Sequence, residues 1–200
     1  MKLRAKLRIA ARTAILEAAE KVFAREGASG ARVEHIAEAA EVAVGTLYNH
    51  FGDRRGLLDA LITARREELL VALDLAMAQT AGQPFVRRLE AFFGAALDHF
   101  ERHRAFFVVA FDAAQPQSLV QPKRSLLREL HARAQGLVKE GTRSKELRAE
   151  YADVSPVLIV GILRALASSA ALSPVRGVPE NGAALAARLS NCFLEGAASR

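Results

Sequence analysis

The sequence predicts an all-α protein, and three observations support this fold class. Hydrophobic residues make up 51% of the 200 residues, Ala and Leu are abundant, and strand-favouring Tyr is rare while Trp is absent. Apolar residues recur at the three- and four-residue spacing of helix faces along most of the chain. A chain of this length can bury a substantial core, as one large domain or as a small domain joined to a larger one.

The first predicted helix follows a basic N-terminal segment. An apolar stripe at helical spacing marks this helix, and Gly27 and Gly30 end it. The stripe consists of Ile15, Ala18, Ala19, Val22 and Phe23. Lys2, Arg4, Lys6, Arg8 and Arg12 all precede the first acidic residue, Glu17, and the net charge is +6. Charge alone fits a solvated tail as well as a phosphate-binding arm.

Two short helices are predicted within residues 32–51. Apolar residues recur at helical spacing over residues 33–40, stop at residues 41–43 and resume over residues 44–51. Ala37 lets the second helix cross the first closely and Val42 can fill the turn, as in a helix-turn-helix. The outer face of the second helix is small, neutral and hydrogen-bonding, which suits a DNA major groove. A buried helical hairpin would give the same apolar pattern.

The next helix begins near Asp53, which can cap it. Its first apolar residues can pack back on the helix-turn-helix, and its later leucines continue onward, so one helix belongs to both halves of the protein. Pro84 suits the first turn of a helix over residues 85–102, and a short aromatic segment follows it. The remaining prediction is a polar loop at residues 115–122, a helix ending at Gly141, a loop or poorly ordered connector over residues 142–153, and helices over residues 155–172 and 181–198.

The stretch GTLYNHFGDRRGLLDALI, residues 45–62, closely resembles the hallmark of the TetR family of transcriptional regulators. The resemblance covers residues 12–62 and implies a helix-turn-helix DNA-binding domain at 9–62, with the motif itself at 32–51, and a helical effector-binding and dimerisation domain at 63–200. It implies phosphate contacts for Tyr48, His50 and Arg54. The other implied DNA-binding residues are Arg32, Val33, Ala43, Val44, Gly45, Thr46 and Asn49.

Several positions depart from the usual family pattern. Arg32 stands where a Thr is usual, so a side chain able to cap the helix is lost. Glu41 stands where the turn usually has Gly, so it must adopt a left-handed conformation or the turn must follow another path. Ala43 and Val44 replace frequent Ser and Lys, so operator contacts cannot be copied from a relative.

Aromatic residues concentrate in the middle third of the chain. Such a cluster is more often core than a ligand site, but the family resemblance implies an effector cavity with apolar walls and a few polar groups. The candidate ligand-binding residues are Phe92, Phe93, His99, His103, Phe107, Phe111 and Asp112. His99 and His103 also have the i, i+4 spacing of helical metal ligands, but no third ligand is evident, so we expect neither a metal nor a cofactor.

The last two helices combine small residues with large apolar ones, and their apolar surface exceeds what one small partner helix can cover. The resemblance implies that these two helices pair with those of a second copy in a four-helix bundle, which makes a homodimer. The alternative is that their apolar residues form an ordinary core within one chain. The expected interface residues are Leu158, Gly161, Ile162, Ala165, Leu185, Leu189 and Phe193.

A cytoplasmic location is expected. Cys192 is the only cysteine, which excludes an intrachain disulfide and fits a reducing compartment. The N-terminus runs into an amphipathic helix instead of a signal peptide. The most apolar run, residues 157–172, contains Arg164 and is shorter than the roughly 20 residues that cross a bilayer.

The resulting prediction is a DNA-binding transcriptional regulator, a repressor that a small apolar or amphipathic effector releases from a palindromic double-stranded operator. No catalytic constellation is evident, so we do not expect an enzyme. Two alternatives stay open: a helical ligand-binding or scaffold protein whose helix-turn-helix is degenerate, and a helical enzyme that uses His99 and His103.

Overall fold

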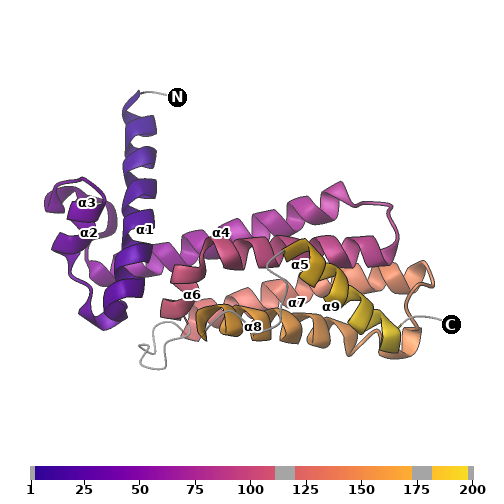
Figure 1. Cartoon of the computed structure of the whole chain (residues 1–200). Helices are drawn as coiled ribbons and strands as arrows, with labels where there is room; N and C mark the ends of the chain where they lie inside the picture. The colour runs from indigo at the N-terminus through magenta and orange to yellow at the C-terminus, as the bar shows by residue number, and fades with distance from the viewer. Residues whose placement is uncertain (1–2, 111–119, 173–181, 198–200) are drawn as a thin grey trace. The chain divides into compact units, whose positions relative to one another are not determined.

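The computed structural model describes residues 3–110, 120–172 and 182–197, and in these ranges all regular structure is helical (Figure 1). The all-α prediction is therefore confirmed. The elements are α1 (Leu3–Gly30), α2 (Val33–Ala39), α3 (Val44–Phe51), α4 (Arg54–Gln79), α5 (Phe85–Arg102), α6 (Arg104–Ala110), α7 (Val120–Arg143), the 3-10 helix η2 (Ala149–Tyr151), α8 (Ser155–Leu172) and α9 (Gly182–Ala197).

The chain divides into two compact units. The first contains residues 1–65 and 104–119, and the second contains residues 66–103 and 120–200. The division falls within α4, three residues beyond the expected domain boundary, and α6 belongs to the first unit. None of the helices in the described ranges is long and apolar enough to span a membrane.

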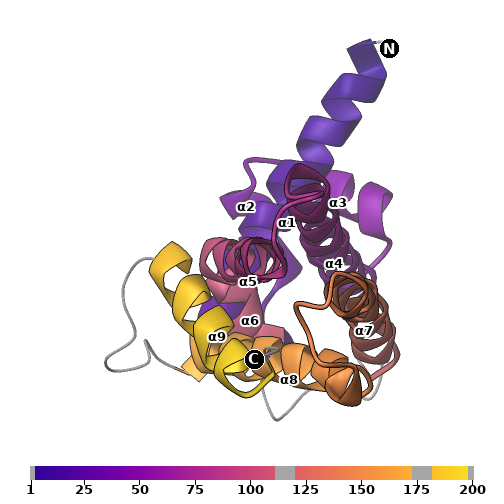
Figure 2. The same ribbon diagram turned by 90° about the vertical axis from the view of Figure 1, so that its right-hand side faces the viewer.

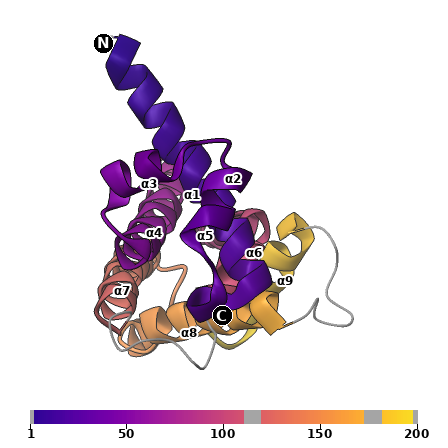
Figure 3. The same cartoon turned by 90° about the vertical axis from the view of Figure 1, so that its left-hand side faces the viewer.

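The first unit is built around the middle of α1, which packs against α2 and α6, while α2 packs against α3 (Figure 3). The predicted apolar stripe of α1 is buried, with Ile15, Ala19 and Phe23 fully inaccessible. Gly27 breaks α1 with φ 77°, as its place in the sequence indicated.

A buried ion pair also joins the two long helices of the first unit. Glu20 accepts a hydrogen bond from Nε of Arg65 at 2.8 Å, and both side chains are more than nine-tenths buried. A buried charge pair of this kind is stable only while both partners are present, so it fixes α1 against the first half of α4.

The second unit has α5 at its centre, in contact with α7, α8 and α9 (Figure 2). One face of α5 supplies fully buried Leu89, Phe92, Phe93 and Ala96, because apolar residues recur along it at helical spacing. Exposed charges join α4 to α7: Arg133 donates both its Nε and Nη2 hydrogens to the carboxylate of Asp74 at 2.7 Å.

Two loop predictions need correction. Gln121 and Pro122, which were expected in a polar loop, lie in the first turn of α7, where a proline is tolerated because its missing N–H would have no helical partner. Residues 142 and 143 end α7, so the connector begins two residues later than predicted, and from residue 144 it is a loop that contains η2, the first of the two forms that the sequence leaves open. Its Glu146 carboxylate accepts a hydrogen bond of 2.7 Å from the backbone N–H of Phe85 and so caps the start of α5.

Candidate nucleic-acid interface

The start of α2 lacks the cap that a threonine would supply. Arg32 occupies the N-cap position in an extended conformation (φ −94°, ψ 144°), and its side chain makes no capping hydrogen bond. The expected loss of a cap is confirmed. The side chain of Arg32 is exposed instead, which leaves its guanidinium available to a phosphate.

The turn after α2 adopts the first of the two conformations that the sequence left open. Glu41 has φ 54°, in the left-handed region. The N–H of Val42 donates to the carbonyl of Ala37 at 3.0 Å, and the N–H of Glu41 donates to the carbonyl of Glu38 at 3.0 Å. These are the two hydrogen bonds of a Schellman motif, which ends a helix through a left-handed residue. The hydrogen bonds therefore hold Glu41 in a conformation that glycine would adopt with less strain.

α3 presents one face to the core and one face outward. Leu47 is fully buried, whereas Ala43, Gly45 and Asn49 are exposed and Thr46 is half-buried. No atom lies within 4 Å of the position that a Cβ would take at Gly45, so the outer face is unobstructed there. The side chains on this outer face are small and neutral, and α3 contains no acidic residue.

The aromatic end of α3 is anchored by α1. The guanidinium of Arg12 lies over the ring of Phe51, 4.9 Å from its centroid, and the ring of His50 lies 5.8 Å from that of Phe51. Tyr48 is 45% exposed, so its phenol is accessible while its ring flanks the helix. These contacts fix the end of α3 and leave the polar tip of Tyr48 accessible.

The connection from α3 to α4 is tight. Gly52 ends α3 with φ 76°, and the Asp53 carboxylate caps α4 by accepting a hydrogen bond of 2.6 Å from the N–H of Gly56. A Cβ on Gly56 would collide with the carbonyl oxygen of Phe51. The first turn of α4 thus passes so close to the end of α3 that residue 56 has no room for a side chain.

Arg54 opens α4 and is half-buried. One of its guanidinium nitrogens lies 3.5 Å from the carbonyl oxygen of Ala31, in the connection between α1 and α2. This long contact orients the side chain across the helix-turn-helix. Arg55 is exposed, and its nearest carboxylate, Asp59, lies 4.0 Å away.

Val33 differs from the other expected DNA-binding residues. Its side chain is only 7% exposed and packs in the small core of α2 and α3. Val44 and His50 are half-buried on α3. We therefore assign the side chain of Val33 to the core and leave it out of the candidate DNA-binding surface.

The candidate ligand-binding residues fall in different parts of the structure. Phe92, Phe93, His99 and His103 lie in the second unit, on α5 or at its C-cap, and all four are buried. Phe107 is buried on α6 in the first unit. Phe111 and Asp112 lie outside the described residues. Glu68 of α4, which no spacing in the sequence marks as a ligand, lies beside the two histidines.

The expected dimer residues form a partly exposed apolar surface. On α8, Leu158 is 55% exposed, Gly161 and Ala165 are exposed and Ile162 is half-buried. On α9, Leu185 and Leu189 are half-buried, whereas Phe193 is buried within the second unit. The uncovered apolar side chains are therefore concentrated on α8.

Residues 15–61 match the family of bacterial regulatory proteins named for tetR. Over 140 residues the chain is 28% identical to the transcriptional repressor KstR2 of Mycobacterium tuberculosis, covering 70% of this chain and 62% of that protein. It is 28% identical over 144 residues to the transcriptional repressor NicS of Pseudomonas putida, covering 70% and 65% of the two chains. The chain therefore spans slightly less than two thirds of the length of these relatives.

Solved structures show the same fold over almost the whole chain. The structure of KstR2 from Mycobacterium tuberculosis has a TM-score of 0.71 at 21% identity and covers 94% of this chain and 95% of that one. The regulator FadR from Bacillus subtilis, solved with stearoyl-CoA, has a TM-score of 0.77 at 18% identity and covers 92% and 98%.

Proposed function

This chain belongs to the TetR family of bacterial regulatory proteins, and we propose that it is a transcriptional repressor that binds a near-palindromic DNA operator as a homodimer. The outer face of α3 is the observation that carries the proposal. That face is unobstructed and neutral, and it is held between the Schellman turn at Glu41 and the close α3–α4 connection at Gly56. A rigid helix with such a face suits the major groove.

We assign base recognition to Thr46 and Asn49, because their polar side chains lie on the outer part of α3. We assign phosphate binding to Tyr48, His50 and Arg54, which lie at the end of α3 and the start of α4. Arg32 at the N-cap of α2 is a further phosphate ligand. Gly45 and Ala43 supply close approach to the DNA backbone, since neither carries a side chain beyond Cβ.

We propose that the apolar surface of α8 pairs with a second copy of the chain. A twofold dimer places two copies of α3 about one helical turn of DNA apart, which a near-palindromic operator requires. Replacing Leu158 with Glu should give a folded monomer with weakened operator binding, measured by light scattering and binding titration. Val71 is 66% exposed on α4, so Val71→Glu is the matched control and should stay dimeric. Equal behaviour of the two variants would exclude α8 from the interface.

A small apolar or amphipathic effector is proposed to release the operator. The bound stearoyl-CoA of the Bacillus subtilis regulator supports an acyl or other elongated apolar ligand class for this fold. The ligand must bind the DNA-free conformation more tightly than the DNA-bound one, because equal affinity for both would leave the operator occupied. α4 is the element that would carry the difference, since it continues from one unit into the other.

Selection from random duplex DNA with the full chain tests the DNA-binding proposal directly. A preferred near-palindromic site is the expected result, and no preference over bulk competitor would refute it. On the selected site, Arg54→Ala should weaken binding to all sequences and lower the salt slope by about 1, whereas Asn49→Ala should change the preferred sequence. The neighbouring Arg55→Ala is the control and should leave affinity and slope unchanged.

A further inference from the structure

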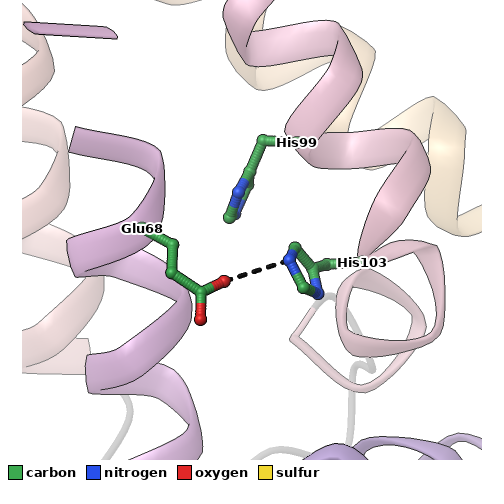
Figure 4. Close-up of side chains that lie close together, drawn as sticks. All are labelled: Glu68, His99 and His103. Atoms are coloured by element: carbon green, nitrogen blue, oxygen red, sulfur yellow. Dashed lines mark ion pairs between the residues drawn. The ribbon is translucent and has the colours of Figure 1, made fainter. Parts of the chain in front are cut away.

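Three potential metal ligands converge within the second unit, outside the DNA-binding helices. They are Glu68 on α4, His99 on α5 and His103 at the C-cap of α5. Figure 4 shows the carboxylate of Glu68 and both imidazole rings directed toward one another. One potential ligand atom from each residue lies within 4.8 Å of the other two. Nε2 of His103 is 3.0 Å from a carboxylate oxygen of Glu68.

The helices predispose this geometry. His99 and His103 are one helical turn apart, so their rings project from the same face of α5, and their centroids are 4.7 Å apart. Both histidines are buried, at 2% and 8% exposure, whereas the Glu68 side chain is 44% exposed. The cluster therefore has a buried nitrogen side and a solvent-accessible oxygen side, through which an ion can enter.

The chemistry of the cluster favours a cation over the other possible occupants. The ion pair between His103 and Glu68 involves one imidazole, and the ring of His99 lies against that of His103. Imidazole nitrogens are the commonest metal ligands in proteins, and two of them lie beside one carboxylate here. An anionic ligand would meet the carboxylate of Glu68 and be repelled.

We propose that Glu68, His99 and His103 bind one divalent transition-metal ion of the zinc class. Two imidazole nitrogens and one carboxylate oxygen are the donor set of sites that hold Zn²⁺ through three protein ligands and leave one position open. Bonds of about 2.0–2.2 Å place tetrahedral ligands about 3.3–3.6 Å apart, and the Glu68 and His103 atoms are now 3.0 Å apart. Small rotamer changes at Glu68 and His99 complete the site.

The ion would join α4 to α5 inside the second unit. Three protein ligands leave one position of a four-coordinate ion for water or a small ligand that carries a donor atom, and the Glu68 side of the cluster is accessible to solvent. Mg²⁺ and Ca²⁺ are excluded by this donor set because they require oxygen ligands. The proposal does not depend on DNA binding, and its test measures only the metal.

The test is a titration of the purified full chain, stripped with EDTA, with Co²⁺ followed by visible absorption and then with Zn²⁺ in competition. One equivalent of Co²⁺ per chain should bind, and Zn²⁺ should displace it and raise the unfolding temperature. Glu68→Gln keeps the shape of this accessible side chain and should weaken Co²⁺ binding at least about tenfold. Mutation of residues that only hydrogen-bond to metal ligands already lowers metal affinity by about this factor, so the loss of a ligand should cost no less. His103→Gln should weaken Co²⁺ binding at least as much.

Glu67→Gln and His131→Gln are the matched controls, because they remove an exposed acid from the same helix and a histidine from α7. Both should bind Co²⁺ as the parent chain does. Circular dichroism in EDTA establishes that each variant is folded. Substoichiometric binding to the parent chain, or equal weakening by the Glu67 and Glu68 substitutions, would overturn the proposal.

Discussion

Replacing Glu41 with Gly should stabilise the protein, although the substitution removes a side chain. Glu41 is held at φ 54° by the two hydrogen bonds that end α2. A left-handed conformation costs a residue with a Cβ roughly 1–2 kcal/mol, a penalty that glycine does not carry. Glycine also gains freedom in the unfolded chain, which costs about 0.4–1 kcal/mol of stability. The expected net gain in the free energy of unfolding is therefore about 0.5–1 kcal/mol.

The assay is thermal and urea unfolding followed by circular dichroism. A gain of this size raises the melting temperature by roughly 1–4 °C in a chain of this length. Two substitutions separate backbone strain from other causes. Glu41→Gln keeps the strain and removes the charge, so it should leave stability unchanged. Ala40→Gly acts at the adjacent residue, which has φ −90°, so it should lose about 0.5–1 kcal/mol.

The strain explanation makes a sharp distinction between neighbouring positions. If Glu41→Gly destabilises the protein as Ala40→Gly does, the left-handed conformation is not a source of strain. If Glu41→Gln gives the same gain as Glu41→Gly, the gain comes from removing an exposed carboxylate. Either result would refute the reasoning from the Schellman motif.

Three further predictions concern the first unit. Gly56→Ala should cost about 1–3 kcal/mol, because its Cβ would overlap backbone atoms at the end of α3, and urea unfolding measures the loss. Glu20→Gln should cost about 3–5 kcal/mol in the same assay, since it leaves the guanidinium of Arg65 buried without its counter-charge. A hydrogen bond from Arg25, assisted by a histidine of α2, lowers the pKa of Glu26 from its ordinary value of 4.5 to about 2. Because the pKa is lowered in the folded protein, this contact stabilises the fold above pH 4.5, and the stabilisation is lost as the pH falls toward 2. In Arg25→Ala the pKa of Glu26, followed by NMR, should rise.

The first two of these predictions have matched controls. Gly45→Ala adds a methyl group to α3 where the added Cβ would meet nothing within 4 Å, so it should not cause the loss in unfolding free energy that a clash causes at Gly56. Glu17→Gln changes an exposed acid on α1 and should lie within about 0.5 kcal/mol of the parent chain. An unchanged pKa of Glu26 in Arg25→Ala would show that the hydrogen bond is not the cause of the shift.

The sequence predicts most helices well, because strong apolar periodicity and clear end signals occur together. α5 begins at Phe85, directly after the proline that marks its first turn, and α8 begins and ends where predicted. Pro122 misleads, because a proline is compatible both with a loop and with the first turn of a helix, and only the packing of α7 decides. The connector that caps α5 through Glu146 carries no periodic pattern, since its order comes from contacts distant in sequence.

The candidate sites differ in how far the sequence determines them. The outer face of α3 follows from periodicity, because burial of Leu47 leaves only one other face. The sequence leaves the conformation of Glu41 open, since two backbone paths are possible until the hydrogen bonds to α2 are known. Glu68 could not be found, because no local spacing links a glutamate on α4 to two histidines on α5. The absence of an evident third ligand in the sequence was therefore no evidence against a metal site.

α3 is held in the fold by one fully buried side chain, so its packing is separate from the residues on its outer face. Leu47 supplies the packing, while Gly45 and Asn49 project from the other face. Exposed substitutions of this kind usually change stability by no more than about 0.5 kcal/mol. Under the proposed function, substitutions at these outward positions can therefore change the preferred DNA sequence without a folding penalty, which makes this short segment a starting point for engineering regulators with new operators.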